Sequence, residues 1–297
     1  MTRTHDPHRP GRRGLARWAT LVSFMAGMLA LSAVPANADA DSPKPREDHA
    51  MGSTIAEHEN QEKGRSLTPR QAEEAAPQAS VQGIDVSHHQ GNINWSAVAN
   101  AGIDFAYMKA TEGTYFIDGK FDRNYTRSYN QGIIRGAYHF ANPSDSGGAA
   151  QARFFVNNGG GWSADGKTLP PVLDIEYNPY GADCYGLTDG QMVNWITDFS
   201  NTVKNLSGRY PAIYTTTNWW STCTGNYGGF ADTNPLWIAR WSSDPNPLPN
   251  GWGTYTIWQY TATGSVSGVN GNVDRNVFNG SYSRLKAFAK CTNENPC

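Results

Sequence analysis

The chain has 297 residues, 38% of them hydrophobic, and a formal net charge of −2 at pH 7. This length allows one large domain or two small ones. The slightly acidic balance argues against nucleic acid as a partner, because nucleic acids are bound by basic surfaces. The aromatic content of 12% suits a packed core and also suits sugar binding, and composition alone favours the core.

The first 40 residues have the organisation of a secretory signal peptide. An arginine-rich start precedes the apolar run Trp18–Val34, and small-x-small cleavage patterns follow. We expect cleavage after Ala38 or Ala40 and a secreted, extracellular protein. The apolar run is short for a membrane span and no stop-transfer pattern follows, so no span is expected after signal removal. Arg12 and Arg13 also fit a twin-arginine export signal, although a basic segment alone explains them.

Residues 41–80 are polar, charged and poor in aromatic and β-branched residues. Such a segment cannot bury enough apolar surface to fold alone. We expect a propeptide or a disordered arm that acts as a spacer, with room for a short helix over Pro69–Ala76. The folded domain is expected over residues 81–297.

Strand-like runs and helical patterns alternate in the first part of this domain. Strands are expected over 82–87, 105–111, 133–141, 171–176 and 210–216. Helical spacing occurs over 95–102, 122–132, 148–157 and 188–206, with Asn94 and Thr188 as caps. This alternation predicts a parallel sheet.

The pattern changes after residue 216. Strands are expected over 235–241, 255–260 and 273–278, joined by segments without helical spacing, and a helix over 281–290 ends the domain. Eight strands can close into a barrel. We therefore predict a single α/β domain, a TIM-like barrel with five βα units followed by three strands on short loops.

The strand over 171–176 ends in two acids. Side chains alternate along a strand, so Asp174 and Glu176 share one face and Ile175 points to the other. Two carboxyl groups at the end of a buried strand are costly unless they are paired, solvated or used. The short motif alone leaves a structural carboxylate pair and an acid/base pair equally open.

The barrel prediction favours catalysis, because reactive groups of such barrels lie at the C-terminal ends of strands. The expected strand ends carry Asp85, Lys109, Glu112, His139, Asp174, Glu176, Tyr214, Trp241, Gln259, Tyr260 and Asp274. Four acids and several aromatic residues would then meet at one mouth. Paired carboxyl groups in an aromatic cleft suit glycoside hydrolysis, in which one group donates a proton and a second group stabilises the developing positive charge.

Four motifs together resemble a known family. Gly83–Gly91 (GIDVSHHQG), Val172–Glu176 (VLDIE), Trp258–Tyr260 (WQY) and Val273-Asp274 are similar to the N-acetylmuramidases of glycoside hydrolase family 25, the Chalaropsis-type lysozymes, and especially to secreted Streptomyces members. The resemblance covers about residues 82–290. It implies a (β/α)5(β)3 barrel and hydrolysis, without a cofactor, of the β-1,4 bond between N-acetylmuramic acid and N-acetylglucosamine in bacterial peptidoglycan.

The resemblance also implies roles for the four acids. Glu176 would be the general acid/base, Asp174 would orient and stabilise the substrate, and Asp85 and Asp274 would complete an acidic floor. Retention of configuration is expected, and either an enzyme carboxylate or the acetamido oxygen of the substrate could attack. Expected substrate-binding residues are Tyr138, His139, Phe140, Tyr177, Tyr214, Trp241 and Gln259. A lone His139 is equally well explained as a core residue, and Lys109 and Glu112 are expected to pair with each other.

All four cysteines follow the signal segment. In an exported protein an even number suggests two disulfides, with three possible pairings. We favour Cys184–Cys223, with Cys291–Cys297 closing the tail. Neither the cysteine spacing nor His88 and His89, which are expected in a turn, predicts a metal site.

We expect a monomer whose partner is the peptidoglycan glycan strand. Two alternatives remain open from the sequence: a hydrolase of another amino sugar polymer such as chitin, and a non-catalytic glycan-binding module. The intact set of acids argues against the binding module, because binding alone does not need a protonatable Glu beside an Asp.

Overall fold

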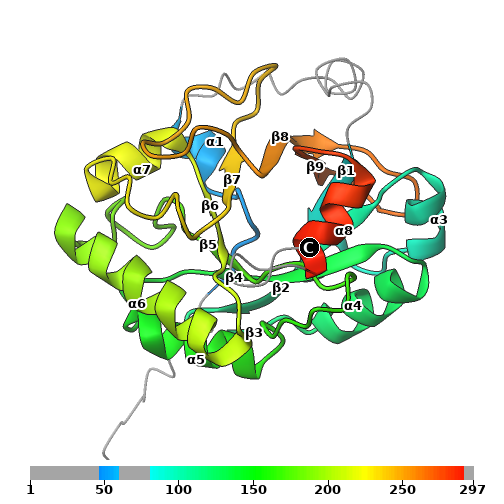
Figure 1. Ribbon diagram of the computed structural model, residues 1–297, viewed down its shortest axis with the longest axis horizontal. Coiled ribbons are helices and arrows are strands. Elements are labelled where there is room, and N and C mark those ends of the chain that lie inside the picture. Colours follow the sequence, from blue (N-terminus) through cyan, green and yellow to red (C-terminus); the bar gives the residue numbers. More distant parts are fainter. Residues whose placement is uncertain (1–46, 60–80, 291–297) are drawn as a thin grey trace, which may run out of the picture. The chain divides into compact units, whose positions relative to one another are not determined.

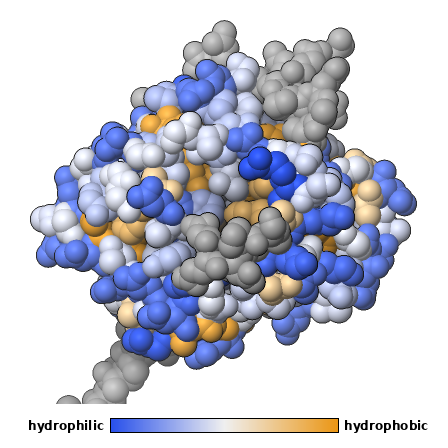
Figure 2. Space-filling view, viewed as in Figure 1, coloured by the Kyte–Doolittle hydropathy of each residue, from blue (hydrophilic) through white to orange (hydrophobic). Residues whose placement is uncertain are grey.

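The computed structural model describes residues 47–59 and 81–290, which belong to one compact unit, 47–297. The expected signal peptide, its cleavage sites, the helix over Pro69–Ala76 and the Cys291–Cys297 pair lie outside the described residues. Within the described ranges, no helix is long and apolar enough to cross a membrane. On the face seen in Figure 2, hydrophobic residues form separate patches among hydrophilic ones.

The described strands form one sheet that closes on itself (Figure 1). Their order is β1-β9-β8-β7-β6-β5-β4-β2-β3, and pairing of β1 with β2 closes the ring. Their bounds are β1 Val81–Val86, β2 Phe105–Glu112, β3 Phe116–Ile117, β4 Ile134–Phe140, β5 Val172–Asp174, β6 Ala212–Thr215, β7 Leu236–Ala239, β8 Ile257–Gly264 and β9 Val273–Phe278. The predicted barrel is confirmed, with β3 as an additional short strand at the edge of β2.

The helices predicted between the first five strands are present. The helical elements are α1 Ile55–His58, η1 His88–Gln90, α3 Trp95–Asn100, α4 Phe121–Asn130, α5 Gly148–Asn157, α6 Asp189–Ser207, α7 Thr217–Thr224 and α8 Tyr282–Lys290. Both predicted caps are confirmed: the Asn94 side chain accepts a hydrogen bond from the amide of Ala97, and that of Thr188 accepts one from the amide of Gln191. These caps fix where α3 and α6 begin.

Helix α7 was not predicted. Its sequence, Thr-Asn-Trp-Trp-Ser-Thr-Cys-Thr, consists of residues with low helix propensity. The helix is stabilised instead by the Thr216 cap, which accepts from the amide of Trp219, and by burial of Trp219 and Trp220. Tertiary packing thus overrides propensity, and α7 completes the fifth βα unit.

Alternation along the strands divides the core into two layers. One cluster, which fills the inside of the barrel, includes Tyr107, Tyr138, Val172, Tyr214 and Trp237. The other cluster packs the outer faces of the strands against the helices and includes Met108, Ala137, Leu173, Ile175 and Ile213 together with Phe155 of α5 and Phe199 of α6. Ile175 therefore lies on the helix side, as the alternation predicted.

Strand β9 differs in direction from the parallel strands predicted for the first part of the domain. It runs antiparallel to both of its neighbours, β8 and β1. Asp274 lies near the start of β9 and pairs in register with Asp85, near the end of β1. The reversed direction is what brings the start of β9 to the C-terminal ends of the parallel strands.

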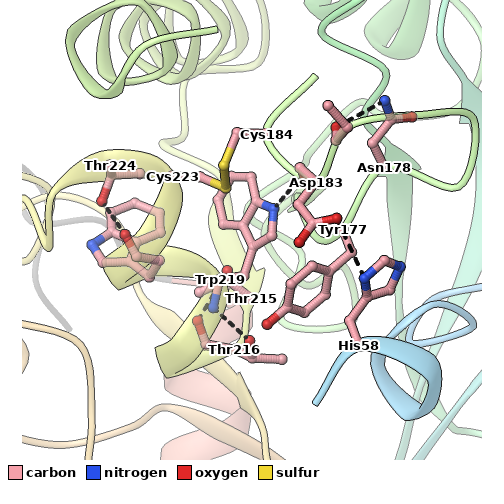
Figure 3. Close-up of a disulfide and its surroundings, with 12 residues drawn as sticks. His58, Tyr177, Asn178, Asp183, Cys184, Thr215, Thr216, Trp219, Cys223 and Thr224 are labelled. Atoms are coloured by element: carbon pink, nitrogen blue, oxygen red, sulfur yellow. Dashed lines mark hydrogen bonds and ion pairs between the residues drawn. A yellow bond between two sulfur atoms is a disulfide. The ribbon is translucent and has the colours of Figure 1, made fainter. Parts of the chain in front are cut away.

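The predicted disulfide Cys184–Cys223 is confirmed (Figure 3). It links the loop that follows β5 to α7, the helix that contains Cys223. Next to it, the indole N–H of Trp219 donates to the carbonyl oxygen of Asp183 at 3.2 Å. The disulfide and this hydrogen bond hold the loop that carries Tyr177 and Asp183 against α7.

Candidate active site

Four acids gather at the C-terminal ends of the barrel strands. Asp85 lies near the end of β1, Asp174 ends β5, Glu176 follows two residues later, and Asp274 enters from β9. Asp85 is 1% exposed, and Asp174 and Glu176 are 0% exposed. The predicted convergence is therefore present, and the acids influence one another's ionisation.

Asp85 is held by side-chain amides. Its Oδ2 accepts from Nδ2 of Asn276 at 2.8 Å and from Nε2 of Gln259 at 3.1 Å. Burial raises the pKa of Asp85 to about 6 although these hydrogen bonds oppose the shift. Asp85 also shares a hydrogen bond with Asp274, whose pKa is raised well above its usual range by burial and by the charge of Asp85. Two carboxyl groups in such contact hold a proton between them.

Asn276 was missed in the sequence. The indole N–H of Trp237 donates to its Oδ1 at 2.9 Å, which turns the amide nitrogen of Asn276 toward Asp85. Asn276 lies two residues after Asp274 on β9, so the two side chains share a face. This two-residue spacing would have identified Asn276 as a neighbour of the acids if the direction of β9 had been known.

Asp174 has the least satisfied carboxyl group of the four. Both of its oxygens are buried without a hydrogen-bond partner among the described residues. Burial, and then the neighbouring charge of Glu176, raise its pKa well above the usual range, while Lys109 acts in the opposite direction. An unpartnered buried carboxyl group is costly, and such a cost is found mainly where a ligand completes the hydrogen bonding.

Glu176 accepts its hydrogen bonds from residues that precede the barrel. Its Oε1 accepts from the amide of Gly52 at 2.8 Å, and its Oε2 accepts from the hydroxyl of Thr54 at 2.9 Å. Burial raises the pKa of Glu176 to about 8, against the effect of these two hydrogen bonds. A carboxyl group with this pKa holds its proton at neutral pH and can act as a general acid.

Aromatic side chains and one amide surround the acids. Gln259 Oε1 accepts from the hydroxyl of Tyr214 at 2.8 Å and from the indole N–H of Trp241 at 2.9 Å. These two donors orient the amide so that its nitrogen faces Asp85. Tyr138 and Phe140 are fully buried nearby on β4. Five of the seven predicted substrate-binding residues therefore lie at the mouth: Tyr138, Phe140, Tyr214, Trp241 and Gln259.

A model described as Glycosyl hydrolases family 25 matches residues 84–269. The chain belongs to this family. It is 58% identical over 217 residues to Lysozyme M1 of Streptomyces globisporus, which covers 73% of this chain and 74% of that protein. It is 44% identical over 214 residues to the N,O-diacetylmuramidase of Chalaropsis sp, covering 71% and 99%.

The fold agrees with the family. The crystal structure of a bacterial lysozyme from Streptomyces coelicolor matches with a TM-score of 0.71 and 57% identity, covering 72% of this chain and 99% of that one. The chain is thus a glycoside hydrolase with the barrel that its motifs implied. The roles of individual residues depend on the geometry described above and below.

His139 does not belong to the mouth of this family 25 barrel. Its ring lies between the sheet and the helices, stacked at 5.3 Å on Phe199 and 5.5 Å from Phe155. Its two nitrogens are satisfied by Thr111 at 2.8 Å and Gln151 at 2.9 Å. The expectation that His139 binds substrate is therefore corrected, and it is a core residue. The alternation that places Tyr138 and Phe140 inside the barrel places His139 outside.

Tyr177 lies at the edge of the mouth. Its ring stacks on His58 with centroids 4.5 Å apart and planes 4° apart (Figure 3). Its hydroxyl donates to Glu59 at 3.1 Å. Lys109 and Glu112 pair with each other at 2.6 Å, as predicted. Neither residue makes a hydrogen bond to the four acids among the described contacts.

Replacing Asp174 by asparagine is expected to weaken the pH dependence of stability. A raised pKa in the folded state stabilises below the unfolded pKa near 4, and this contribution is lost as pH rises toward the folded values, which are about 6 for Asp85 and about 8 for Glu176. Asparagine removes one titratable carboxyl group from the four acids. The loss of unfolding free energy between pH 5 and pH 8 should therefore shrink by roughly 1–3 kcal/mol.

Urea denaturation at pH 5 and pH 8 measures this difference. The exposed Asp198 of α6 provides the control, because Asp198→Asn makes the same chemical change away from the acids. An equal loss in the parent and in Asp174→Asn would show that Asp174 does not contribute to the pH dependence.

Proposed function

We propose that this family 25 hydrolase is a lysozyme that cleaves the β-1,4 bond between N-acetylmuramic acid and N-acetylglucosamine in bacterial peptidoglycan. The observation that carries the proposal is the position of Glu176 beside three further acids at the C-terminal ends of the barrel strands. The relatives named above, a lysozyme and an N,O-diacetylmuramidase, support the same class of substrate.

In the proposed mechanism Glu176 donates its proton to the glycosidic oxygen as the bond breaks. The resulting carboxylate then takes a proton from the attacking water. Asp174 has no partner for its carboxyl oxygens among the described residues, so it is free to hydrogen-bond the acetamido group of the substrate. Held in this way, the acetamido oxygen attacks the anomeric carbon, and two displacements give retention.

The remaining residues position the sugar and stabilise charge. Asp85, fixed by two amides, supplies negative charge near the developing oxocarbenium ion, and Asp274 shares its proton. The rings of Tyr138, Tyr214 and Trp241 offer flat surfaces for sugar rings.

We also propose that the enzyme is a secreted monomer, with a signal peptide over 1–40, a pro-segment over 41–80 and the barrel domain over 81–297.

The new reducing end identifies the bond that is cut. Purified peptidoglycan is digested, the new ends are reduced with borohydride, and the reduced sugars are identified by mass spectrometry. We expect reduced N-acetylmuramic acid. Reduced N-acetylglucosamine, or faster release from chitin than from peptidoglycan, would contradict the proposal. Binding to peptidoglycan without any product would favour a glycan-binding module.

A further inference from the structure

The catalytic acids of a polysaccharide hydrolase must reach solvent to meet their substrate, yet Asp174 and Glu176 are 0% exposed. Glu176 is covered in part by residues 47–59 of the same chain, which precede the barrel. We infer that residues 47–59 form an autoinhibitory segment that occupies the substrate cleft and must be displaced before a glycan strand can bind. The inference rests on the proposed function of this cleft. Figure 1 shows the segment, in blue, within the ring of strands.

Both carboxyl oxygens of Glu176, the proposed general acid, accept hydrogen bonds from the segment. Gly52 and Thr54 donate to Oε1 and Oε2 of Glu176, at 2.8 and 2.9 Å. The Thr54 hydroxyl also lies 3.2 Å from the carbonyl oxygen of Tyr177. While these hydrogen bonds persist, the glycosidic oxygen of a substrate has no place next to Glu176.

Apolar side chains of the segment fill the inner mouth of the barrel. Met51 is 2% exposed and Ile55 is 0% exposed, and both belong to the cluster that contains Tyr138 and Tyr214. The amide of Met51 donates to the Tyr138 hydroxyl at 3.3 Å. The rings proposed to bind sugars are therefore covered by the chain itself.

Gly52 allows an approach that a side chain would prevent. Its φ is +75°, and a Cβ atom at this position would lie 2.8 Å from the Tyr214 hydroxyl and 3.3 Å from Trp241. Only glycine accepts this conformation without strain. The backbone of the segment is thus fitted closely to the residues that line the cleft.

Both ends of the segment are anchored, on opposite sides of the mouth. On the β2 side, Lys109 Nζ donates to Asp48 at 3.1 Å and to the carbonyl oxygen of His49 at 2.6 Å, and the amide of His49 donates to Glu112 at 2.9 Å. On the α7 side, His58 lies 3.4 Å from Asp183 (Figure 3).

Glu59, the last described residue of the segment, accepts hydrogen bonds on the α7 side. Its donors are the Tyr177 hydroxyl at 3.1 Å and Nδ2 of Asn218 at 3.3 Å. A segment held at both ends and at its centre spans the cleft and competes with a substrate that needs the same residues. Because it is tethered, its effective concentration is high and independent of protein concentration.

Displacing the segment in the full chain tests the inference. Thr54→Asp buries a charged group at a position that is 4% exposed and sets an acceptor against the carbonyl oxygen of Tyr177, so it should expel the segment. Gly52→Ala should do so through the contact with Tyr214. If the segment occupies the cleft in roughly nine molecules of ten or more, kcat/KM on soluble peptidoglycan fragments should rise about tenfold or more, mainly through a lower KM. Ser53→Asp is the matched control. Ser53 is exposed, so the new aspartate carboxylate would lie in solvent.

Hydrogen exchange supplies a readout that does not depend on turnover. In the parent chain and in Ser53→Asp, amides of residues 47–59 should be protected, and in Thr54→Asp this protection should fall while that of the barrel strands persists. Parental kcat/KM in both Thr54→Asp and Gly52→Ala, or an unprotected segment in the parent, would overturn the inference. Absence of product from every chain, with protection lost in Thr54→Asp, would instead overturn the proposed function.

Discussion

Replacing Glu176 by glutamine is expected to lower the rate of peptidoglycan hydrolysis by roughly 10²–10⁴-fold, the usual contribution of a positioned general acid. Glutamine keeps the size of the side chain and one acceptor oxygen. It cannot give a proton to the leaving oxygen. Initial rates of reducing-end release from purified peptidoglycan measure the effect, in the Gly52→Ala background so that the segment over residues 47–59 does not limit both chains.

The matched control for this substitution is Glu57→Gln. Glu57 is an exposed residue of α1. The same chemical change there should leave the rate in the Gly52→Ala background unaltered. A Glu176→Gln chain that clears peptidoglycan at the rate of its background would exclude Glu176 as the proton donor, and Asp174 would then be the next residue to examine.

The position of the four acids was predictable from two patterns: the alternation of side chains along a strand, and the order of strands and helices along the chain. The alternation along Val172–Glu176 separates Asp174 and Glu176 from Leu173 and Ile175, and the structure has that separation. The sequence of strands and helices placed these acids at one end of a barrel. The same alternation, applied to Tyr138, His139 and Phe140, would have removed His139 from the cleft residues, because its neighbours on both sides point inward.

The direction of β9 was not predicted because local patterns do not encode strand direction. The connection between β8 and β9 spans only residues 265–272 in the structure, and parallel neighbours need a crossover of roughly a dozen residues or more. The absence of a helix did not decide the direction, because β7 and β8 are also joined without a helix and run parallel. The same reasoning explains Asp274 and Asn276, whose place at the mouth depends on that direction.

The position of residues 47–59 in the cleft could not be predicted from local sequence patterns. Low apolar content indicates that a segment does not fold by itself, but it does not test whether the segment fits a preformed cleft. Two buried apolar residues, Met51 and Ile55, are enough here because the barrel supplies the rest of the surface. The contact between Gly52 and Glu176 joins residues 124 apart in the chain, and no short pattern reports such a distance.

A second large effect is expected at the ion pair of β2. Lys109 and Glu112 are both 0% exposed, and Nζ lies 2.6 Å from Oε2. Lys109→Met should lower the free energy of unfolding at pH 7 by about 3–5 kcal/mol, because it leaves a buried carboxylate without its cation. Lys286→Met, which changes an exposed lysine of α8, should shift it by no more than about 0.5 kcal/mol. Urea denaturation of the full chains measures both.

The pH dependence separates a lost ion pair from lost packing. Burial acts to raise the pKa of Glu112, but the hydrogen bond from His49 and the charge of Lys109 outweigh it and lower the pKa to about 2. A lowered pKa stabilises the fold above the unfolded value of about 4.5, and this contribution is lost as pH falls toward 2. The difference between the parent and Lys109→Met should therefore shrink between pH 7 and pH 3, and adding Glu112→Gln should recover part of the loss at pH 7. A difference that is constant over this range, with no recovery in the double variant, would mean that the aliphatic part of Lys109, and not its charge, stabilises the barrel.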